Sequence, residues 1–268
     1  MAPVLPLSEA LAPLTADPRR AAVLLDVDGT LAPIVRHADD AHVPEPTRAP
    51  LIAIAKRYGV VACVSGRRAA VARRIVSLGS ITYVGNHGTE VLRAGATEAE
   101  VDPEIAEWTA RVRAWARAAQ TGPLDRLRVR PEDKEAIAAF HWRGAPDEAA
   151  AEAALRELAA RAEDEGFATH WGRKVLEVRP PVAMGKGRGI ARLLEQQQLG
   201  VALYAGDDRT DLDAFAGLRA LVDSGGLGAA LCVGVRSEET PPELEAAADL
   251  MVDGPPGVRD LLVALTHT

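Results

Sequence analysis

Two aspartates spaced one residue apart, Asp26 and Asp28, directly follow an apolar run at residues 22–25. An ionised carboxylate at the end of an apolar run needs a partner, because its transfer out of water is costly. In open α/β sheets, the carboxyl ends of the strands are also where ligands bind. A simple turn would explain Gly29 and one aspartate, since both residue types are common in turns. The placement of Asp26 immediately after the apolar run favours a functional role for the pair.

Polar residues also follow the apolar runs at 60–64, 81–85 and 201–205, which are typical of buried parallel strands. Lys186 begins the helix that is predicted before the last of these runs. If the sheet is doubly wound, the carboxyl ends of these strands converge on one edge. The candidate residues at these strand ends are Ser65, Arg67, Asn86, His87, Gly88, Asp207, Asp208 and Asp211.

Five aspartates would then share one crevice. They would repel each other by on the order of several kcal/mol unless a cation is present. All are oxygen ligands, and no His or Cys of metal-ligand spacing accompanies them, so the sequence predicts a hard cation, Mg²⁺. A Mg²⁺ ion, together with Lys186, Ser65 and Arg67, supplies the positive charge and hydrogen bonds that a phosphoryl group under attack requires. The pattern therefore predicts phosphoryl-transfer chemistry.

The chain contains neither a G-x-S-x-G nucleophile elbow nor a P-loop, and residues 185–187 are too short to form one. Asp26 therefore remains as the candidate nucleophile, forming an aspartyl-phosphate. Asp28 can protonate the leaving oxygen and then activate water. The aspartates at 207–211 could instead be an N-capping cluster before a helix. Their shared need for a cation with Asp26 and Asp28 favours a metal site.

Strands and helices alternate on both sides of a segment with a different pattern. The alternation predicts an α/β core over residues 1–90 and 184–268, with a doubly wound, mostly parallel sheet. Residues 91–183 contain two long amphipathic stretches and four short strand-like stretches, which predict an inserted α+β domain.

Local signals set further expectations for single elements. Thr47 is a candidate N-cap for a helix that runs to Tyr58. The alternation at 126–130 and the apolar segments at 135–142 and 219–222 predict three short strands.

The composition is that of a globular protein, with 48% hydrophobic residues among 268. A net charge of −7 and a pI near 5.5 argue against a nucleic-acid partner, which usually requires a basic stripe. Cys63 and Cys232 lie in apolar runs and are expected to be buried thiols. Neither a secretory leader nor an apolar run long enough to cross a bilayer is visible. We therefore expect a cytoplasmic protein without a membrane partner.

Four stretches resemble the motifs of the haloacid dehalogenase-like phosphatases, in the order that this superfamily has them. They are residues 26–30, 65–67, 186 and 206–211. The resemblance implies the superfamily's Rossmann-like core, and the insertion between the second and third motifs matches its larger α/β type of cap domain. It also implies that Asp26 is the nucleophile and a metal ligand, and that Asp28 is the acid/base and binds the metal through its carbonyl.

The same resemblance implies that Ser65 and Lys186 hold the phosphate. The residues that it places at the metal are Asp26, Asp28, Asp207, Asp208 and Asp211.

Finer features resemble the trehalose-6-phosphate phosphatase family. They are residues 31–34, 85–90, 132–134, 141–143, 174–180 and 213–215. The resemblance implies Mg²⁺-dependent hydrolysis of trehalose 6-phosphate, a small-molecule sugar phosphate, in trehalose biosynthesis. It further implies a functional link to a trehalose-6-phosphate synthase, and we expect a monomer. The substrate-binding residues that it implies are Arg67, Asn86, His87, Gly88, Glu132, Lys134, Lys174 and Glu177.

One position departs from the family pattern: Leu212 stands where the family usually has Glu, which affects the choice of substrate more than the reaction. The charged residues at 132–134 and 174–177 could also be solvated turns or strand faces. The rival enzymes are a phosphomutase and a phosphatase for sucrose phosphate, mannosyl-phosphoglycerate or a hexose phosphate. The rival from another class is a catalytically silent sugar-phosphate sensor or regulatory domain. The presence of Asp26 and Asp28 argues against a silent protein.

Overall fold

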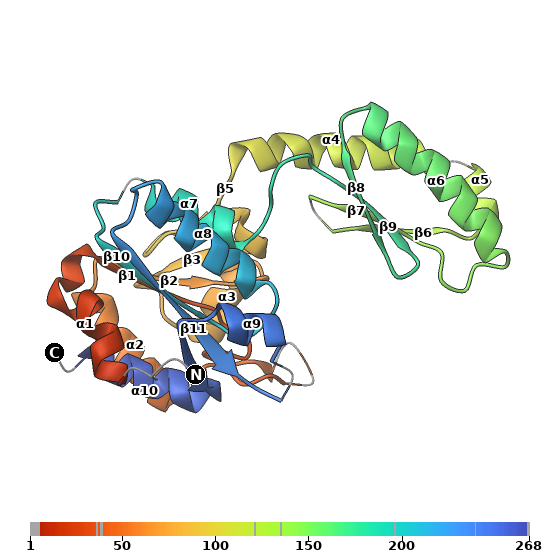
Figure 1. Cartoon of the computed structure of the whole chain (residues 1–268). Helices are drawn as coiled ribbons and strands as arrows, with labels where there is room; N and C mark the ends of the chain where they lie inside the picture. Colours follow the sequence, from red (N-terminus) through yellow and green to blue (C-terminus); the bar gives the residue numbers. More distant parts are fainter. Residues whose placement is uncertain are drawn as a thin grey trace. The chain divides into compact units, whose positions relative to one another are not determined.

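The computed structural model describes residues 6–35, 37, 40–120, 122–134, 136–195, 197–238 and 240–266. The chain divides into two compact units, Met1–Glu100 with Met184–Thr268, and Val101–Ala183 (Figure 1). We call the first the core unit and the second the inserted unit. Among the described residues, no helix has both the length and the hydropathy that crossing a membrane would require.

The core unit contains a mostly parallel sheet with the strand order β12-β11-β10-β1-β2-β3-β4-β5. Neighbours from β12 to β3 pair in parallel, and β3 and β4 pair antiparallel. The strands are β1 Ala21–Leu25, β2 Val60–Val64, β3 Thr82–Gly85, β4 Glu90–Leu92, β5 Glu100–Val101, β10 Val201–Gly206, β11 Ala229–Arg236 and β12 Leu250–Asp253. This topology confirms the predicted doubly wound α/β fold class.

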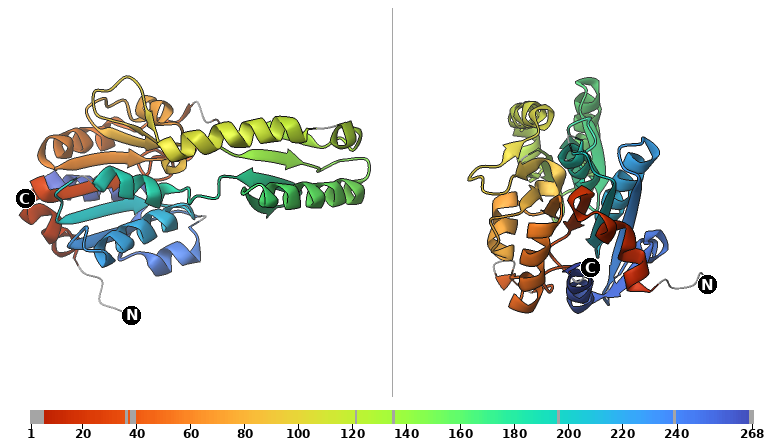
Figure 2. Two further views of the ribbon diagram at one scale, coloured as in Figure 1. Left: turned by 90° about the horizontal axis from the view of Figure 1, so that it is seen from above. Right: turned by 90° about the vertical axis from the view of Figure 1, so that its left-hand side faces the viewer.

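Helices cover both faces of this sheet (Figure 2). They are α1 Leu7–Ala16, α2 Glu45–Arg57, α3 Ala69–Val76, α7 Lys186–Leu194, α8 Asp211–Asp223, α9 Pro242–Ala247 and α10 Gly254–Thr266, with 3₁₀ turns η1 Pro18–Arg20 and η3 Asn86–Gly88. Every residue of β1 is buried, and its side chains alternate between two apolar layers. Val23 and Leu25 pack with the layer of α1, α2, α3 and α10, whereas Leu24 packs with that of α7, α8 and α9. This two-sided burial fixes the end of β1.

Two local predictions for the core unit are wrong. Thr47 is not an N-cap: α2 begins at Glu45, and Pro46 in its first turn suits a helix start because its missing amide hydrogen is not needed there. The predicted strand at 219–222 is the last part of α8. Leu221 and Val222 pack against the same apolar layer as Leu218, so the helix continues through them.

The inserted unit is a four-stranded antiparallel sheet, in the order β6-β7-β9-β8, with two long helices on one face. Its elements are α4 Pro103–Ala119, α5 Gly122–Arg126, β6 Arg130–Asp133, β7 Ala138–His141, α6 Glu148–Asp164, β8 Ala168–Gly172 and β9 Val175–Arg179. Phe140 and Leu176 of the sheet pack against Val112 of α4 and Leu155 of α6. The opposite face of this sheet carries the polar side chains.

The inserted unit begins at Val101, later than the boundary at residue 91 that the sequence predicts, because β4 pairs with β3 in the core sheet. The strand predicted at 126–130 is also wrong. Arg128 has a φ of +55°, which ends any extended run, so β6 starts only at Arg130. Of the strand predicted at 135–142, Glu135 lies outside the described residues, and the strand itself is Ala138–His141.

Candidate active site

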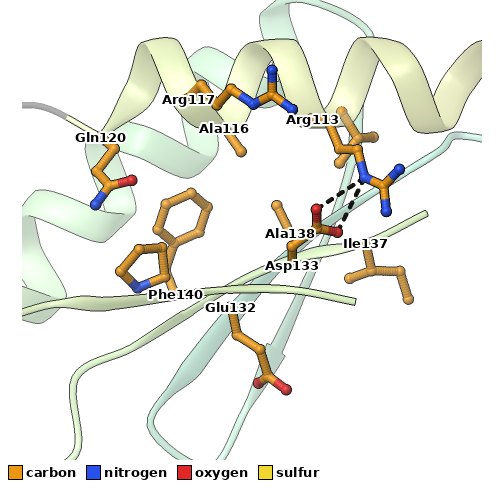
Figure 3. Close-up of a pocket in the computed structure, with 11 residues that line it drawn as sticks. Arg113, Ala116, Arg117, Gln120, Glu132, Asp133, Ile137, Ala138 and Phe140 are labelled. Atoms are coloured by element: carbon orange, nitrogen blue, oxygen red, sulfur yellow. Dashed lines mark hydrogen bonds and ion pairs between the residues drawn. The ribbon is translucent and has the colours of Figure 1, made fainter. Parts of the chain in front are cut away.

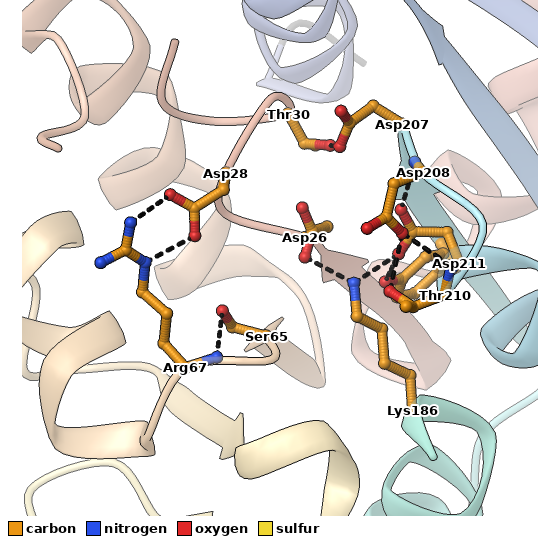
Figure 4. Close-up of polar contacts among 11 residues, drawn as sticks. Asp26, Asp28, Thr30, Ser65, Arg67, Lys186, Asp207, Asp208, Thr210 and Asp211 are labelled. Atoms are coloured by element: carbon orange, nitrogen blue, oxygen red, sulfur yellow. Dashed lines mark hydrogen bonds and ion pairs between the residues drawn. The ribbon is translucent and has the colours of Figure 1, made fainter. Parts of the chain in front are cut away.

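The carboxyl ends of β1 and β10 lie side by side, because the two strands pair in parallel with Leu25 opposite Ala205. The Asp26 amide extends this pairing by donating to the Ala205 carbonyl at 2.9 Å. Gly29, in the following turn, has a φ of +81°, and a Cβ there would lie 2.0 Å from an Asp207 carboxylate oxygen. A glycine is therefore required at this turn. The register brings together the acidic segments that follow the two strands (Figure 4).

Lys186 lies between two of the buried carboxylates. Its Nζ is 2.7 Å from Asp26 Oδ1 and 2.7 Å from Asp211 Oδ1 (Figure 4). Burial would lower the pKa of Lys186, but these two carboxylates raise it above its ordinary value, so the ammonium stays charged. The helix that starts at Lys186 is held by Asp213, which accepts a hydrogen bond of 2.7 Å from the Gly187 amide.

Asp26, Asp207 and Asp211 are buried, and each offers one oxygen within 4.8 Å of the others. Burial raises the pKa of Asp26, with Asp211 adding to the effect. Burial, followed by the charges of Asp211 and Asp208, raises the pKa of Asp207 to about 7. One ammonium, that of Lys186, does not neutralise three buried carboxylates. The donors are all carboxylate oxygens, which suits a hard divalent cation such as Mg²⁺.

Asp211 already accepts several hydrogen bonds from the protein. Besides Lys186, the buried hydroxyl of Tyr204 donates to its Oδ1, and the Asp208 amide donates to its Oδ2 at 2.9 Å. Sequence reasoning missed Tyr204, because in an apolar strand it looks like a core residue. Thr30, which was also missed, donates to Asp207 Oδ1 at 3.3 Å. These donors hold the acidic side chains in place.

Asp208 has a different environment from the three buried aspartates. Its Oδ1 accepts hydrogen bonds of 2.7 Å from both the amide and the hydroxyl of Thr210, and it also receives the Asp211 amide at 3.3 Å. Burial would raise the pKa of Asp208, but the Thr210 donors, the charge of Lys186 and the hydrogen bond with Asp211 together lower it. These contacts hold the turn that precedes α8, whose N-cap is Thr210, without a side-chain cap hydrogen bond.

Asp28 is paired with Arg67. The guanidinium Nε is 2.7 Å from Asp28 Oδ2, and Nη2 is 2.8 Å from Oδ1. In Figure 4 the Asp28 carboxylate points toward Arg67 and away from Asp207 and Asp208. Ser65, whose side chain is buried, accepts a hydrogen bond of 3.1 Å from the Arg67 amide. The acidic residues thus form two groups, one around Lys186 and one around Arg67.

The turn after β3 packs against the loop that carries Arg67. Asn86, His87 and Gly88 all have positive φ angles, and a Cβ on Gly66 would lie 2.6 Å from the His87 ring. Burial, together with the charge of Lys186, lowers the pKa of His87, so its ring is neutral near pH 7. Positive φ in two consecutive non-glycine residues is strained, and such strain is common at functional sites.

The polar face of the inserted sheet brings together three of the four charged residues predicted there. Lys134 Nζ is 3.1 Å from Glu177 Oε1 and 3.9 Å from Glu132 Oε2. Strand register explains this, because Glu132 and Glu177 both lie opposite Ala139. Lys174 is not in this group: it pairs with Glu148.

Two further residues join the group on the polar face. His141 Nε2 is 2.8 Å from Glu132 Oε2, and Arg179 contacts Glu177. The sequence analysis did not assign His141 to a site, and only the period-two alternation of β7 and β9 could have placed it on this face.

A hollow of about 260 Å³ lies on the other face of this sheet, between α4 and β6–β7 (Figure 3). Its floor includes Phe140, and an ion pair between Arg113 and Asp133 lines one side. Glu132 is part of the lining, but in Figure 3 its carboxylate points away from the hollow. This hollow is therefore part of neither the acidic site of the core unit nor the charged cluster on the polar face of the inserted sheet.

The sequence also matches known proteins. A family model described as trehalose-phosphatase matches residues 24–241. A trehalose-phosphate phosphatase of Mycobacterium tuberculosis is 33% identical over 203 residues, covering 74% of this chain and 51% of the relative. A probable trehalose-phosphate phosphatase 4 of Oryza sativa subsp. japonica is 29% identical over 209 residues, covering 75% and 56%. The chain thus spans about half the length of these relatives.

The fold has close counterparts among solved structures. The trehalose-6-phosphate phosphatase of Aspergillus fumigatus superposes with a TM-score of 0.72 at 23% identity, covering 99% of each chain. The likeness extends over both the core unit and the inserted unit, and it shows the fold alone.

Proposed function

Because the chain belongs to the trehalose-phosphatase family, we propose that it hydrolyses trehalose 6-phosphate to trehalose and phosphate. The observation that carries this proposal is the buried group of Asp26, Asp207 and Asp211 around the Lys186 ammonium. The substrate is suggested by the names of the relatives, and the reaction by the chemistry of these side chains. We extend the proposal to a functional link with a trehalose-6-phosphate synthase.

Asp26 is the proposed nucleophile. Its carboxylate oxygen attacks the phosphorus in line with the sugar oxygen, the bond between phosphorus and that oxygen breaks, and an aspartyl-phosphate forms. Asp28 gives the leaving oxygen a proton and afterwards takes one from the water that attacks the phosphorus. The second step releases phosphate and restores Asp26. Each turnover therefore consumes one water molecule.

The remaining groups compensate for the charge of the phosphate. Asp26 and Asp207 would hold Mg²⁺, which when bound supplies charge neutralisation for the phosphoryl oxygens. Lys186 contributes a fixed positive charge, and the Ser65 hydroxyl can donate to a phosphoryl oxygen. Asp211 acts mainly on Lys186, since its own oxygens already accept hydrogen bonds from the protein.

The residues on the polar face of the inserted sheet are the proposed contacts for the sugar. Carboxylates and ammonium groups bind hydroxyls through charge-assisted hydrogen bonds, which reject a substrate that lacks the matching group. Glu132, Lys134 and Glu177 supply such groups within one cluster. The pairing of Lys174 with Glu148 leaves Lys174 out of this proposed contact set.

The test is phosphate release from trehalose 6-phosphate, sucrose 6-phosphate and glucose 6-phosphate, with Mg²⁺ and with EDTA. We expect turnover of trehalose 6-phosphate to be fastest and to require Mg²⁺. The Asp26→Asn variant should be inactive, and Asp260→Asn, at an exposed carboxylate of α10, should behave as the wild type. Faster turnover of another ester would reassign the substrate, and activity of Asp26→Asn would refute the assignment of the nucleophile.

A further inference from the structure

Arg67 is anchored through its backbone on both sides of the residue. Its amide donates to Ser65 Oγ at 3.1 Å, and its carbonyl accepts from the Asn86 amide at 2.7 Å. The preceding Gly66 lies against the His87 ring so closely that a Cβ would be 2.6 Å from it. The Arg67 side chain therefore extends from a fixed point beside the end of β2.

Asp28 is held in an equally tight turn. The Ala32 amide donates to the Val27 carbonyl at 2.8 Å, and the Gly29 amide donates to the Ala32 carbonyl at 2.8 Å. These two hydrogen bonds fix the backbone on both sides of Asp28. The remaining freedom of this residue is the rotation of its side chain.

The contact between the two side chains removes that freedom. Nε and Nη2 of Arg67 each take a different oxygen of Asp28, at 2.7 and 2.8 Å. Two parallel hydrogen bonds from a planar guanidinium fix both the position and the rotation of a carboxylate, which a lysine ammonium cannot do. The side chains are 22% and 37% exposed, so the pair lies at the solvent edge of the site.

We propose that Arg67 is a positioning residue that orients the Asp28 carboxyl group toward the leaving oxygen, and that it is not a ligand of the sugar. Two of the five N–H donors of the guanidinium, one on Nε and one on Nη2, already bind Asp28. This inference rests on the proposed phosphatase function and deepens it. It assigns to Arg67 a role in the step that breaks the bond to the sugar.

The leaving group distinguishes positioning from substrate binding. A sugar alkoxide leaves only with a proton, whereas the nitrophenolate of p-nitrophenyl phosphate is a stable anion and leaves without one. Misplacing Asp28 should therefore slow the first step, in which the leaving group departs, far more for the sugar ester than for the aryl ester. The second step, in which Asp28 takes a proton from water, is the same for both esters. A ligand of the sugar would instead change KM for the sugar ester, and a ligand of the phosphate would affect both esters equally.

The experiment compares the single-turnover rate of leaving-group release at saturating ester for the wild type and Arg67→Gln, on trehalose 6-phosphate and p-nitrophenyl phosphate. We expect this rate to fall in Arg67→Gln by about 10- to 100-fold on the sugar ester and by less than about threefold on the aryl ester, with the half-saturating concentration nearly unchanged. Arg259→Gln is the matched control, because it removes the same charge from a side chain of α10 that is 41% exposed and paired with Asp260. It should behave as the wild type on both esters.

Arg67→Lys keeps the charge and tests the geometry if Arg67→Gln folds poorly. It should show the same preference for the aryl ester, because a lysine makes no planar two-point contact. Free guanidinium, added below denaturing concentrations to Arg67→Ala, should restore part of the rate of leaving-group release on the sugar ester. Equal losses in the rate of leaving-group release on both esters, or a change confined to the half-saturating concentration of the sugar ester, would overturn the inference.

The wild-type protein decides the proposed function separately. If it hydrolyses a sugar phosphate other than trehalose 6-phosphate, the substrate proposal fails, and the Arg67 comparison is made with that ester. If it hydrolyses no phosphate ester, both proposals fall. If the Arg67 inference alone is wrong, the wild type still hydrolyses the sugar ester, and Arg67→Gln slows leaving-group release by the same factor on both esters.

Discussion

Replacing Asp207 with asparagine should weaken a pH dependence of stability that the metal-free protein shows. Asp207 is 6% exposed, and its pKa is raised from 3.8 to about 7, first by burial and then by Asp211 and Asp208. A carboxyl group with a higher pKa in the folded chain than in the unfolded chain binds its proton more tightly when folded. The free energy of unfolding therefore falls as the pH rises from about 4 through about 7.

The size of the effect follows from the two pKa values. A difference between 3.8 and about 7, at about 1.4 kcal/mol per pH unit, corresponds to about 4 kcal/mol in total. Linkage places about 3 kcal/mol of this loss between about pH 5 and about pH 8. A bound Mg²⁺ ion stabilises the ionised carboxylate and should cancel the dependence.

Urea unfolding in EDTA at these two pH values, for the wild type, Asp207→Asn and Asp260→Asn, measures this difference directly. The wild type and the exposed control Asp260→Asn should both lose stability at the higher pH, while Asp207→Asn should lose about 3 kcal/mol less. In excess Mg²⁺, the wild type should no longer lose more stability between the two pH values than Asp207→Asn does. An unchanged slope in Asp207→Asn, or a wild type that is more stable at the higher pH in EDTA, would show that this account of the acidic group is wrong.

Three further predictions concern single positions. Lys186→Met leaves buried carboxylates without their ammonium, so metal-free unfolding should cost about 3–5 kcal/mol less; equal stability in urea would contradict this. Gly29→Ala places a Cβ against Asp207, so Mg²⁺ affinity in calorimetry should fall by about 10-fold or more. Gly95→Ala, also at positive φ but with open space around it, is its control and should bind as the wild type does. Lys134→Ala should raise KM for trehalose 6-phosphate by about 10-fold, with KM for p-nitrophenyl phosphate unchanged; equal changes for both esters would remove Lys134 from the sugar site.

The central strands and their acidic ends were predictable from the sequence because burial on both faces leaves a continuous apolar run. Asp26 follows such a run directly, and Asp207 follows one after Gly206. Their juxtaposition also followed, since strands of a doubly wound sheet end on one edge. The structure adds the register that places Leu25 opposite Ala205.

Side-chain partners could not be predicted in the same way, because they depend on rotamers and on register between distant segments. The pairing of Arg67 with Asp28 joins two loops, and either residue alone looks like a ligand of the substrate. Tyr204 has the pattern of a core residue until its hydroxyl is seen to reach Asp211. Lys174 seemed equivalent to Lys134 in the sequence, yet only Lys134 lies beside Glu177.

The position of β1 in the sheet has a consequence for the synthesis of the chain. β1 is central, but its neighbour β10 is made only after the whole inserted unit. A nascent chain that has not reached Asp211 therefore has an open edge on a wholly apolar strand and only part of its acidic cluster. Such edges are prone to wrong pairing, and domains fold as they emerge from the ribosome. The full set of carboxylates therefore comes together only after the last third of the chain has begun to fold.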